Sequence, residues 1–142
     1  PSIVAELNAP RTVDSLRAQI NKGNAIARGN GRAYGDSAIS AQNTIHMRHF
    51  NRILEFDPER GYLLAEAGVL LKDIIDVSLP SGWFPYVTPG TKFVTLGGMI
   101  AAGFSPRNHV AVEGMAGFHP ARFSRPAIPR AARLGDACFF IA

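Results

Sequence analysis

Apolar residues near the start of the chain repeat with the spacing of a helix. In the segment RTVDSLRAQINKG, Val13, Leu16 and Ile20 fall on one helical face. Thr12 stands just before them and can act as the N-cap, while Gly23 follows them as a C-terminal stop. The pattern predicts an amphipathic helix that begins after Thr12 and ends before Gly23.

Four short runs then carry apolar residues over lengths typical of strands. Two of them, AIA at residues 25–27 and NTIHMR at residues 43–48, stand alone. The other two, RILEF at residues 52–56 and YLLAEA at residues 62–67, are joined by DPERG, in which proline and glycine occupy good turn positions. The second pair therefore predicts a β-hairpin.

Helical spacing returns in LLKDIIDVSLP, where apolar residues between Leu70 and Leu79 share one face, and Pro80 with Gly82 end the helix. A third helix is predicted in VTLGGMIAA at residues 94–102, which is small and apolar and has a threonine available as a cap. Helices and strands in this order predict an α+β domain with a mixed sheet and flanking helices.

The most informative local motif is the glycine-rich stretch RGNGRAYGDS from Arg28 to Ser37. Its glycines permit positive φ, so consecutive backbone N–H groups can converge on a diphosphate, and its arginines add positive charge. The GxGxxxG spacing is not the dinucleotide-binding GxGxxG fingerprint, and no Gly-Lys-Ser/Thr follows as in a P-loop. From the pattern alone, an ordinary surface turn and a ligand-binding loop are equally consistent with these residues.

Two separated segments resemble a known family. ARGNGRAYGDSA, followed about fifty residues later by PGTKFVTLGGMIAA, is similar to the two flavin-contacting segments of the FAD-linked oxidases of the vanillyl-alcohol-oxidase type, which share a PCMH-type FAD-binding domain. The resemblance covers about residues 3–102 and is closest to the decaprenylphosphoryl-ribose oxidase branch. It implies FAD as the cofactor and, for the fold, the first subdomain of a PCMH-type FAD-binding domain, incomplete at the C-terminus.

The resemblance also implies which residues hold the flavin. The family's diphosphate loop falls on Arg28, Gly29, Asn30, Gly31, Arg32, Ala33, Tyr34, Gly35, Asp36 and Ser37, and its second segment on Gly90, Thr95, Leu96, Gly97 and Gly98. The last three are expected to begin a helix whose free N–H groups and positive dipole end suit a phosphate or a flavin carbonyl.

Several single positions refine this assignment. Relatives that attach the flavin covalently have a histidine about where Arg32 stands, so the resemblance implies non-covalent FAD. Asp36 is open to two interpretations: its carboxylate binds the ligand, or it stabilises the turn as an Asx residue. Beyond the paired glycines the resemblance weakens, because only Asn108 and His109 faintly match the family's residues beside the flavin ring, and Ser105 stands near the place of another histidine.

Charge and composition change at residue 103. Up to residue 102 the chain has 10 Lys and Arg against 9 Asp and Glu, whereas the remainder has 5 against 2 and holds 4 of the 10 prolines. This tail shows neither strand alternation nor a helical face, and its interleaved arginines form no nucleic-acid-binding surface. We expect residues 1–102 to form the N-terminal subdomain of the FAD-binding domain, and residues 103–142 to be a divergent or frameshifted, poorly ordered tail.

Other residues that suggest chemistry have a simpler interpretation. His46 and His49 have the spacing of some metal sites, but no third ligand is evident, so no metal site is expected. Trp83, Phe84 and Tyr86 could stack on a flavin, yet the prolines around them favour the packing of a loop onto the core.

The acidic residues and the single cysteine indicate no catalytic site. Glu66, Asp73 and Asp76 are interpreted as ordinary surface charge, and Cys138 cannot form an internal disulfide. No apolar run approaches the roughly 20 residues needed to span a bilayer, and the start of the chain lacks a signal-peptide pattern. A cytoplasmic protein without a transmembrane segment is expected.

These expectations indicate the FAD-binding portion of a flavin-dependent oxidoreductase that acts on a sugar or alcohol CH–OH group, of the polyprenylphosphoryl-ribose or aldonolactone type. In the family that the chain resembles, a later domain supplies most of the substrate pocket and the base, so this chain alone is expected to be inactive and no catalytic residue is named. The alternative is a truncated, catalytically inactive fragment or a simple anion-binding module.

Overall fold

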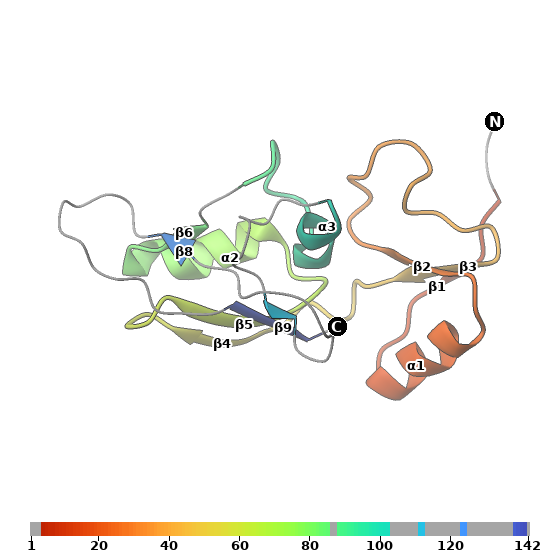
Figure 1. Ribbon diagram of the computed structural model, residues 1–142, viewed down its shortest axis with the longest axis horizontal. Coiled ribbons are helices and arrows are strands. Elements are labelled where there is room, and N and C mark those ends of the chain that lie inside the picture. The colour runs from red at the N-terminus through yellow and green to blue at the C-terminus, as the bar shows by residue number, and fades with distance from the viewer. Residues whose placement is uncertain (1–3, 86–87, 103–110, 113–122, 125–137, 142) are drawn as a thin grey trace.

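The computed structural model describes residues 4–85, 88–102, 111–112, 123–124 and 138–141. Its helices and strands form two lobes, the first with a three-stranded sheet and the second with a four-stranded and a two-stranded sheet (Figure 1). The first lobe contains residues 4–50, and the second lobe contains the described residues from 51 onward. Helices and a mixed sheet in this arrangement agree with the predicted α+β class.

The first lobe is a three-stranded parallel sheet covered on one face by a helix. Strands β1 (Leu7–Asn8), β2 (Ala25–Arg28) and β3 (Asn43–His46) lie in the order β1-β3-β2. Helix α1 (Val13–Asn21) connects β1 to β2 and lies below the sheet in Figure 1. The helix and the two isolated strands are confirmed, and β1 is an additional short strand.

Helix α1 begins at a reciprocal cap. The hydroxyl of Thr12 accepts a hydrogen bond from the N–H of Ser15, as expected of an N-cap, and the Ser15 hydroxyl accepts one from the N–H of Thr12. Of the three residues predicted to share its apolar face, Leu16 is buried, whereas Val13 and Ile20 are 46% and 51% exposed. The helix therefore packs against the rest of the protein mainly through Leu16.

The second lobe is built on the predicted hairpin. Strands β4 (Ile53–Asp57) and β5 (Tyr62–Glu66) pair antiparallel, β9 (Cys138–Ile141) lies parallel to β5, and β7 (Ala111–Val112) lies parallel to β9. Strand β9 was not predicted, because a run of four apolar residues shows no alternation that distinguishes a strand from other buried structure. Apart from these two strands and β8, described next, the predicted tail lies outside the described residues.

Short helices complete the second lobe. Helix α2 (Leu71–Ser78) covers one face of the hairpin and continues into the 3-10 turn η1 (Leu79–Ser81). Strand β6 (Phe84–Pro85) pairs with β8 (Phe123–Ser124), and α3 (Leu96–Ala101) lies between the lobes in Figure 1. Both helices predicted after the hairpin are confirmed. Within the described ranges, no helix has the length and apolar character needed to cross a membrane.

Apolar side chains form one cluster in the second lobe and another at the junction of the lobes. In the second-lobe cluster, the indole N–H of Trp83 donates to the carbonyl of Pro58 at 2.7 Å, so Trp83 packs the turn onto the core as predicted. The second-lobe cluster consists of Leu63, Ala65, Val69, Ile74, Trp83 and Leu96. The junction cluster consists of Leu16, Ile45, Met47 and Phe50, with Ala67 packed against it.

The lobes are joined by main-chain contacts of residues 66–70, which we call the hub segment. The N–H of Gly68 donates to the carbonyl of Phe50 at 2.7 Å. A Cβ added at Gly68 would lie 2.3 Å from the Met47 carbonyl oxygen and 2.5 Å from that of Phe50. Only glycine therefore allows the hub segment to lie this close to the turn that follows β3.

Glu66 is buried, so its interpretation as ordinary surface charge is wrong. Its carboxylate accepts hydrogen bonds from the main-chain N–H of Arg52 at 2.8 Å and from the guanidinium at 2.7 Å. Burial raises the pKa of Glu66, but the hydrogen bonds and charge of Arg52 outweigh burial and hold the pKa below its ordinary value. Asp73 and Asp76 do lie on the surface, beside Lys72.

Gly68→Ala should destabilise the protein by about 1–3 kcal/mol, the usual range for forcing extra atoms into a packed position. The added methyl group has to displace two main-chain carbonyls, which cannot rotate away as a flexible side chain would. Urea unfolding followed by the fluorescence of Trp83 measures the change in the free energy of unfolding. Gly90→Ala is the matched control, because nothing lies within 4 Å of its added Cβ, and equal stability of the two variants would contradict the close contact.

Protonation of Glu66 should destabilise the fold in acid. Because its folded-state pKa lies below the ordinary 4.5, the carboxylate contributes stability above that pH and loses it as the pH falls through the folded-state value. Glu66→Gln should be less stable than the parent protein at neutral pH, and the difference should shrink as the pH falls below 4.5 and through the lowered folded-state pKa. Urea unfolding across this pH range measures it, with the exposed Asp76→Asn as control. A constant difference between Glu66→Gln and the parent at every pH would refute the role of the carboxylate.

Candidate functional site

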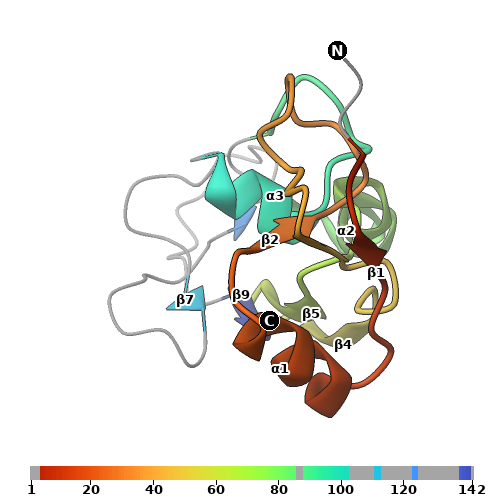
Figure 2. The same ribbon diagram turned by 90° about the vertical axis from the view of Figure 1, so that its right-hand side faces the viewer.

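The glycine-rich loop, residues 29–37, leaves β2 and rises on the side of the sheet opposite α1 (Figure 2). Gly31 and Gly35 have φ angles of +65° and +59°, which residues with a side chain rarely adopt. In the described part of the chain, no group accepts a hydrogen bond from the main-chain N–H groups of this loop. These main-chain donors are therefore free to bind an anion.

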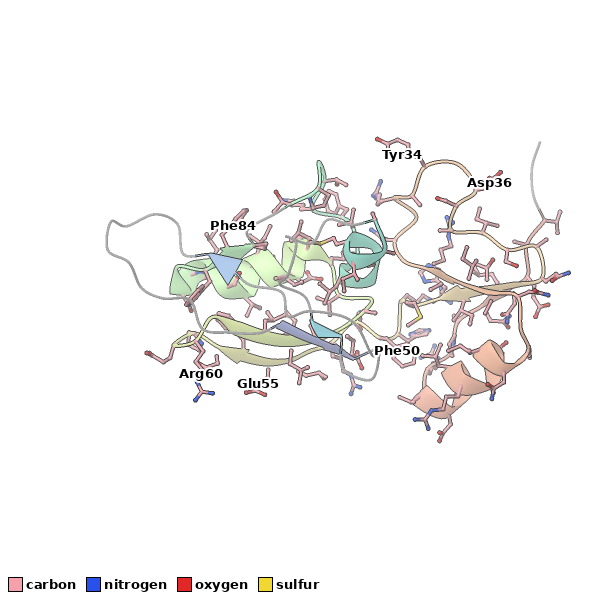
Figure 3. The ribbon with its side chains drawn as sticks, viewed as in Figure 1. Tyr34, Asp36, Phe50, Glu55, Arg60 and Phe84 are labelled. Atoms are coloured by element: carbon pink, nitrogen blue, oxygen red, sulfur yellow. The ribbon has the colours of Figure 1, made fainter. Side chains whose placement is uncertain are left out.

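Polar side chains extend from the tip of the loop. Tyr34 is 98% exposed, and Tyr34 and Asp36 both point away from the two sheets in Figure 3. The Ser37 hydroxyl donates to the carbonyl of Tyr34, and the Asp36 carbonyl accepts from the N–H of Ile39, so main-chain and serine groups close the turn. Among the described residues, the Asp36 carboxylate accepts no hydrogen bond from a main-chain N–H, which an Asx turn requires. This argues against the interpretation of Asp36 as an Asx residue.

The second segment is held by the hub segment. Thr95 caps α3 by accepting a hydrogen bond from the N–H of Gly98. The N–H groups of Leu96 and Gly97 donate to the carbonyls of Val69 and Ala67, each at 2.8 Å. The expectation that these first N–H groups are free for a phosphate or a flavin carbonyl is therefore wrong, because the hub segment and the cap already use them.

The structure brings the two segments into contact, as the resemblance implies. The side-chain amide of Asn30 donates to the carbonyl of Phe93 at 2.9 Å. A Cβ added at Gly29 would lie 2.3 Å from the Thr95 hydroxyl oxygen, so the loop begins directly against the cap of α3. The loop and the start of α3 therefore form one continuous surface, although they lie more than sixty residues apart in the chain.

Three cationic side chains gather at this contact. Arg32 and Lys92 lie 5.6 Å and 5.8 Å from the centre of the Phe93 ring, and the Arg28 guanidinium lies 3.0 Å from the position of a Cβ on Gly31. In the described part of the chain, none of the three forms an ion pair with a carboxylate. Free main-chain donors together with unpaired cations fit a diphosphate group.

Lys92 and Phe93 were missed in the sequence, although they lie inside the motif PGTKFVTLGG. The interpretation of that motif relied on its glycine and threonine positions. An aromatic ring that lies beside two cations leaves no recognisable spacing in the sequence. The described residues contain no group of three His, Cys, Asp or Glu that could hold a metal ion. Tyr86, Asn108 and His109 lie outside the described residues.

Comparison with known proteins yields a family and two relatives. The family described as FAD binding domain matches residues 6–116, which include both segments and extend past residue 102. Decaprenylphosphoryl-beta-D-ribose oxidase of Mycolicibacterium smegmatis is 40% identical over 85 residues, 59% of this chain and 18% of that protein. D-2-hydroxyglutarate dehydrogenase of Escherichia coli is 37% identical over 76 residues, 51% of this chain and 7% of that protein. Each alignment thus spans less than a fifth of the relative.

A solved structure of an alkyldihydroxyacetonephosphate synthase has a similar fold. It superimposes with a TM-score of 0.52 at 20% sequence identity, over 67% of this chain and 21% of the synthase. At this identity the likeness concerns the arrangement of helices and strands alone.

Gly29 and Thr95 should be energetically coupled. Gly29→Ala should cost about 1–3 kcal/mol because its Cβ meets the Thr95 side chain, and Thr95→Ala should cost about 1 kcal/mol through the lost cap. In the double variant the obstructing hydroxyl and methyl groups are gone, so the combined loss should be smaller than the sum. Urea unfolding of the four proteins measures the coupling, and strict additivity would show that the two segments do not touch.

Proposed function

The chain belongs to the FAD binding domain family, and on this premise we propose that it holds FAD for a flavin-dependent oxidoreductase that acts on the CH–OH group of a sugar or alcohol. The contact between the glycine-rich loop and the start of α3 carries the proposal. Two segments that each resemble a flavin-contacting motif meet through Asn30 and Phe93, and through Gly29 and Thr95. A dinucleotide cofactor needs a surface of this length, with a diphosphate cradle at one part of it.

The loop supplies the donors for the diphosphate in this proposal. Its free N–H groups between Gly29 and Ser37 bind the phosphate oxygens, while Arg28 and Arg32 balance their charge. The guanidinium of Arg32 lies 5.6 Å from the centre of the Phe93 ring, and among the described residues it has no carboxylate partner. Because no histidine stands at position 32, FAD is bound without a covalent link.

The second segment supplies shape rather than donors. With the N–H groups of Leu96, Gly97 and Gly98 already bonded, Gly97 and Gly98 serve in packing, because a Cβ at Gly97 would lie 3.2 Å from Ala67 and one at Gly98 would lie 3.1 Å from the Thr95 hydroxyl oxygen. Gly90 is exposed, with open space around it, and we assign its absent side chain to the close approach of the cofactor. We thus assign the second segment to the body of the cofactor.

Once bound, FAD supplies the redox chemistry by accepting a hydride from the carbon that carries the hydroxyl group. This chain contributes binding and orientation. The names of the two relatives, a ribose oxidase and a 2-hydroxyglutarate dehydrogenase, support a CH–OH donor as the substrate class. We favour a polyprenyl-phosphate sugar, with an aldonolactone-type sugar as the alternative. In this proposal a later domain supplies the catalytic base and most of the substrate pocket, as the resemblance implies.

The organisation proposed is an N-terminal FAD-binding subdomain over residues 1–102, followed by a divergent segment from residue 103. The family match to residue 116 indicates that some family character extends beyond this boundary.

Purified protein supplied with FAD should keep its flavin absorbance after desalting, and acid precipitation should release the flavin because no covalent bond holds it. Arg32→Gln should weaken FAD binding about tenfold, the loss expected for one charge-assisted contact of about 1.4 kcal/mol. Quenching of flavin fluorescence measures the affinity. The matched control is Arg60→Gln, since Arg60 pairs with Asp57 at the hairpin turn of the second lobe, away from the loop (Figure 3).

Two results would contradict the proposal. A colourless protein that FAD does not stabilise against urea would favour an inactive fragment or a simple anion-binding module. Equal loss of affinity in Arg32→Gln and Arg60→Gln would show that FAD binds through general charge rather than through the loop.

A further inference from the structure

A second group of basic side chains lies where the strands of the first lobe end. The three strands are parallel, so their carboxyl ends meet at one edge of the sheet, and Arg28 at the end of β2 lies in register with His46 at the end of β3. Arg48 and His49 follow β3 directly, and Arg11 follows β1 by three residues. We call these five residues the basic edge.

Local hydrogen bonds fix part of this arrangement. The main-chain N–H of Arg48 donates to Nδ1 of His46 at 3.2 Å, and the N–H of Met47 donates to the carbonyl of Arg28 at 2.9 Å. With Nδ1 as the acceptor, the neutral imidazole of His46 carries its proton on Nε2, where it can donate to a ligand. Strand pairing and the turn after β3 thus place Arg28, His46 and Arg48 together.

The basic edge has no internal counter-charge in the described part of the chain. Neither Arg11, Arg28 nor Arg48 forms an ion pair, and the nearby Asp14, in the first turn of α1, pairs with Arg17 instead. Helix α1 also begins at this edge, because it follows β1, and its N-terminal end adds positive potential. A bound anion would therefore reduce the repulsion among these like charges.

The pKa values of the two histidines reflect this excess of positive charge. Burial, followed by the charges of Arg48, Arg28 and His49, lowers the pKa of His46. Burial, followed by the charges of Arg11 and Arg48, lowers the pKa of His49. The charges of the basic edge thus influence one another, although its residues come from three separate parts of the chain.

We propose that the basic edge binds the phosphate group of a second, phosphorylated ligand, at the same time as FAD occupies the glycine-rich loop. Ligands of open parallel sheets bind outside the carboxyl ends of the strands, which is where these residues lie. A phosphate monoester matches the set, because its oxygens accept bonds from guanidinium groups and from an imidazole N–H, and its charge offsets three arginines. Arg28 is shared with the loop, so the two anions occupy adjoining positions.

Histidine titration by NMR tests the site directly, with inorganic phosphate as the probe and chloride at matched ionic strength as the reference. The resonances are assigned with His46→Gln and His49→Gln. Phosphate should raise the pKa of both histidines in a saturable way, since a bound anion stabilises the protonated rings. Arg48→Gln and Arg11→Gln should each weaken phosphate binding about tenfold, while the control Arg60→Gln should leave it unchanged.

Repeating the titration with FAD-saturated protein separates the two anion sites. A phosphate effect that persists with FAD bound supports a second ligand, whereas an effect that FAD abolishes assigns the basic edge to the cofactor and overturns the proposal. An equal effect of chloride, or full binding in both arginine variants, would also overturn it. If the protein binds no FAD at all, the proposed function fails, and the titration without FAD still decides whether the basic edge is a phosphate site.

Discussion

The hub segment is the element on which both lobes and the candidate site depend. On one side, the N–H of Gly68 donates to the carbonyl of Phe50 in the turn after β3, and the two stretches of main chain lie too close for a side chain at position 68. On the other side, the carbonyls of Ala67 and Val69 accept the first N–H groups of α3. The two lobes and helix α3 are thus positioned by the main chain of a few residues.

The hydrogen bonds of the hub segment give the glycine-rich loop and the start of α3 different roles in the proposed site. A helix start is ordinarily a ready anion site, but here the hub segment consumes those donors to hold α3 in place. The glycine-rich loop keeps its own donors free because Gly31 and Gly35 carry the main chain through conformations that form no internal ladder. In the proposed site, one segment is therefore anchored through its N–H groups and would contribute surface, while the other keeps its N–H groups free and would contribute hydrogen bonds.

Local features were predictable from the sequence and long-range ones were not. The cap at Thr12 and the hairpin turn depend on residues a few positions apart, so their signals lie within a short window. The burial of Glu66 depends on Arg52, which comes opposite only through the irregular register of β4 and β5. The basic edge required knowing that three strands are parallel, and the occupied N–H groups of α3 required knowing the path of the hub segment. The proposal of a flavin site came from resemblance, since the spacing of the glycines alone was equally consistent with a surface turn.

The two apolar clusters differ in what they join rather than in how much chain they enclose. The buried members of the second-lobe cluster extend from Leu63 to Leu96 and those of the junction cluster from Leu16 to Phe50, which are nearly equal lengths of chain. Closing loops of nearly equal length costs nearly equal conformational entropy, so loop length gives neither cluster precedence during folding. The glycine-rich loop belongs to the lobe that docks through that junction. A bound cofactor that spans the loop and α3 would therefore connect the two lobes a second time, beside the hub segment.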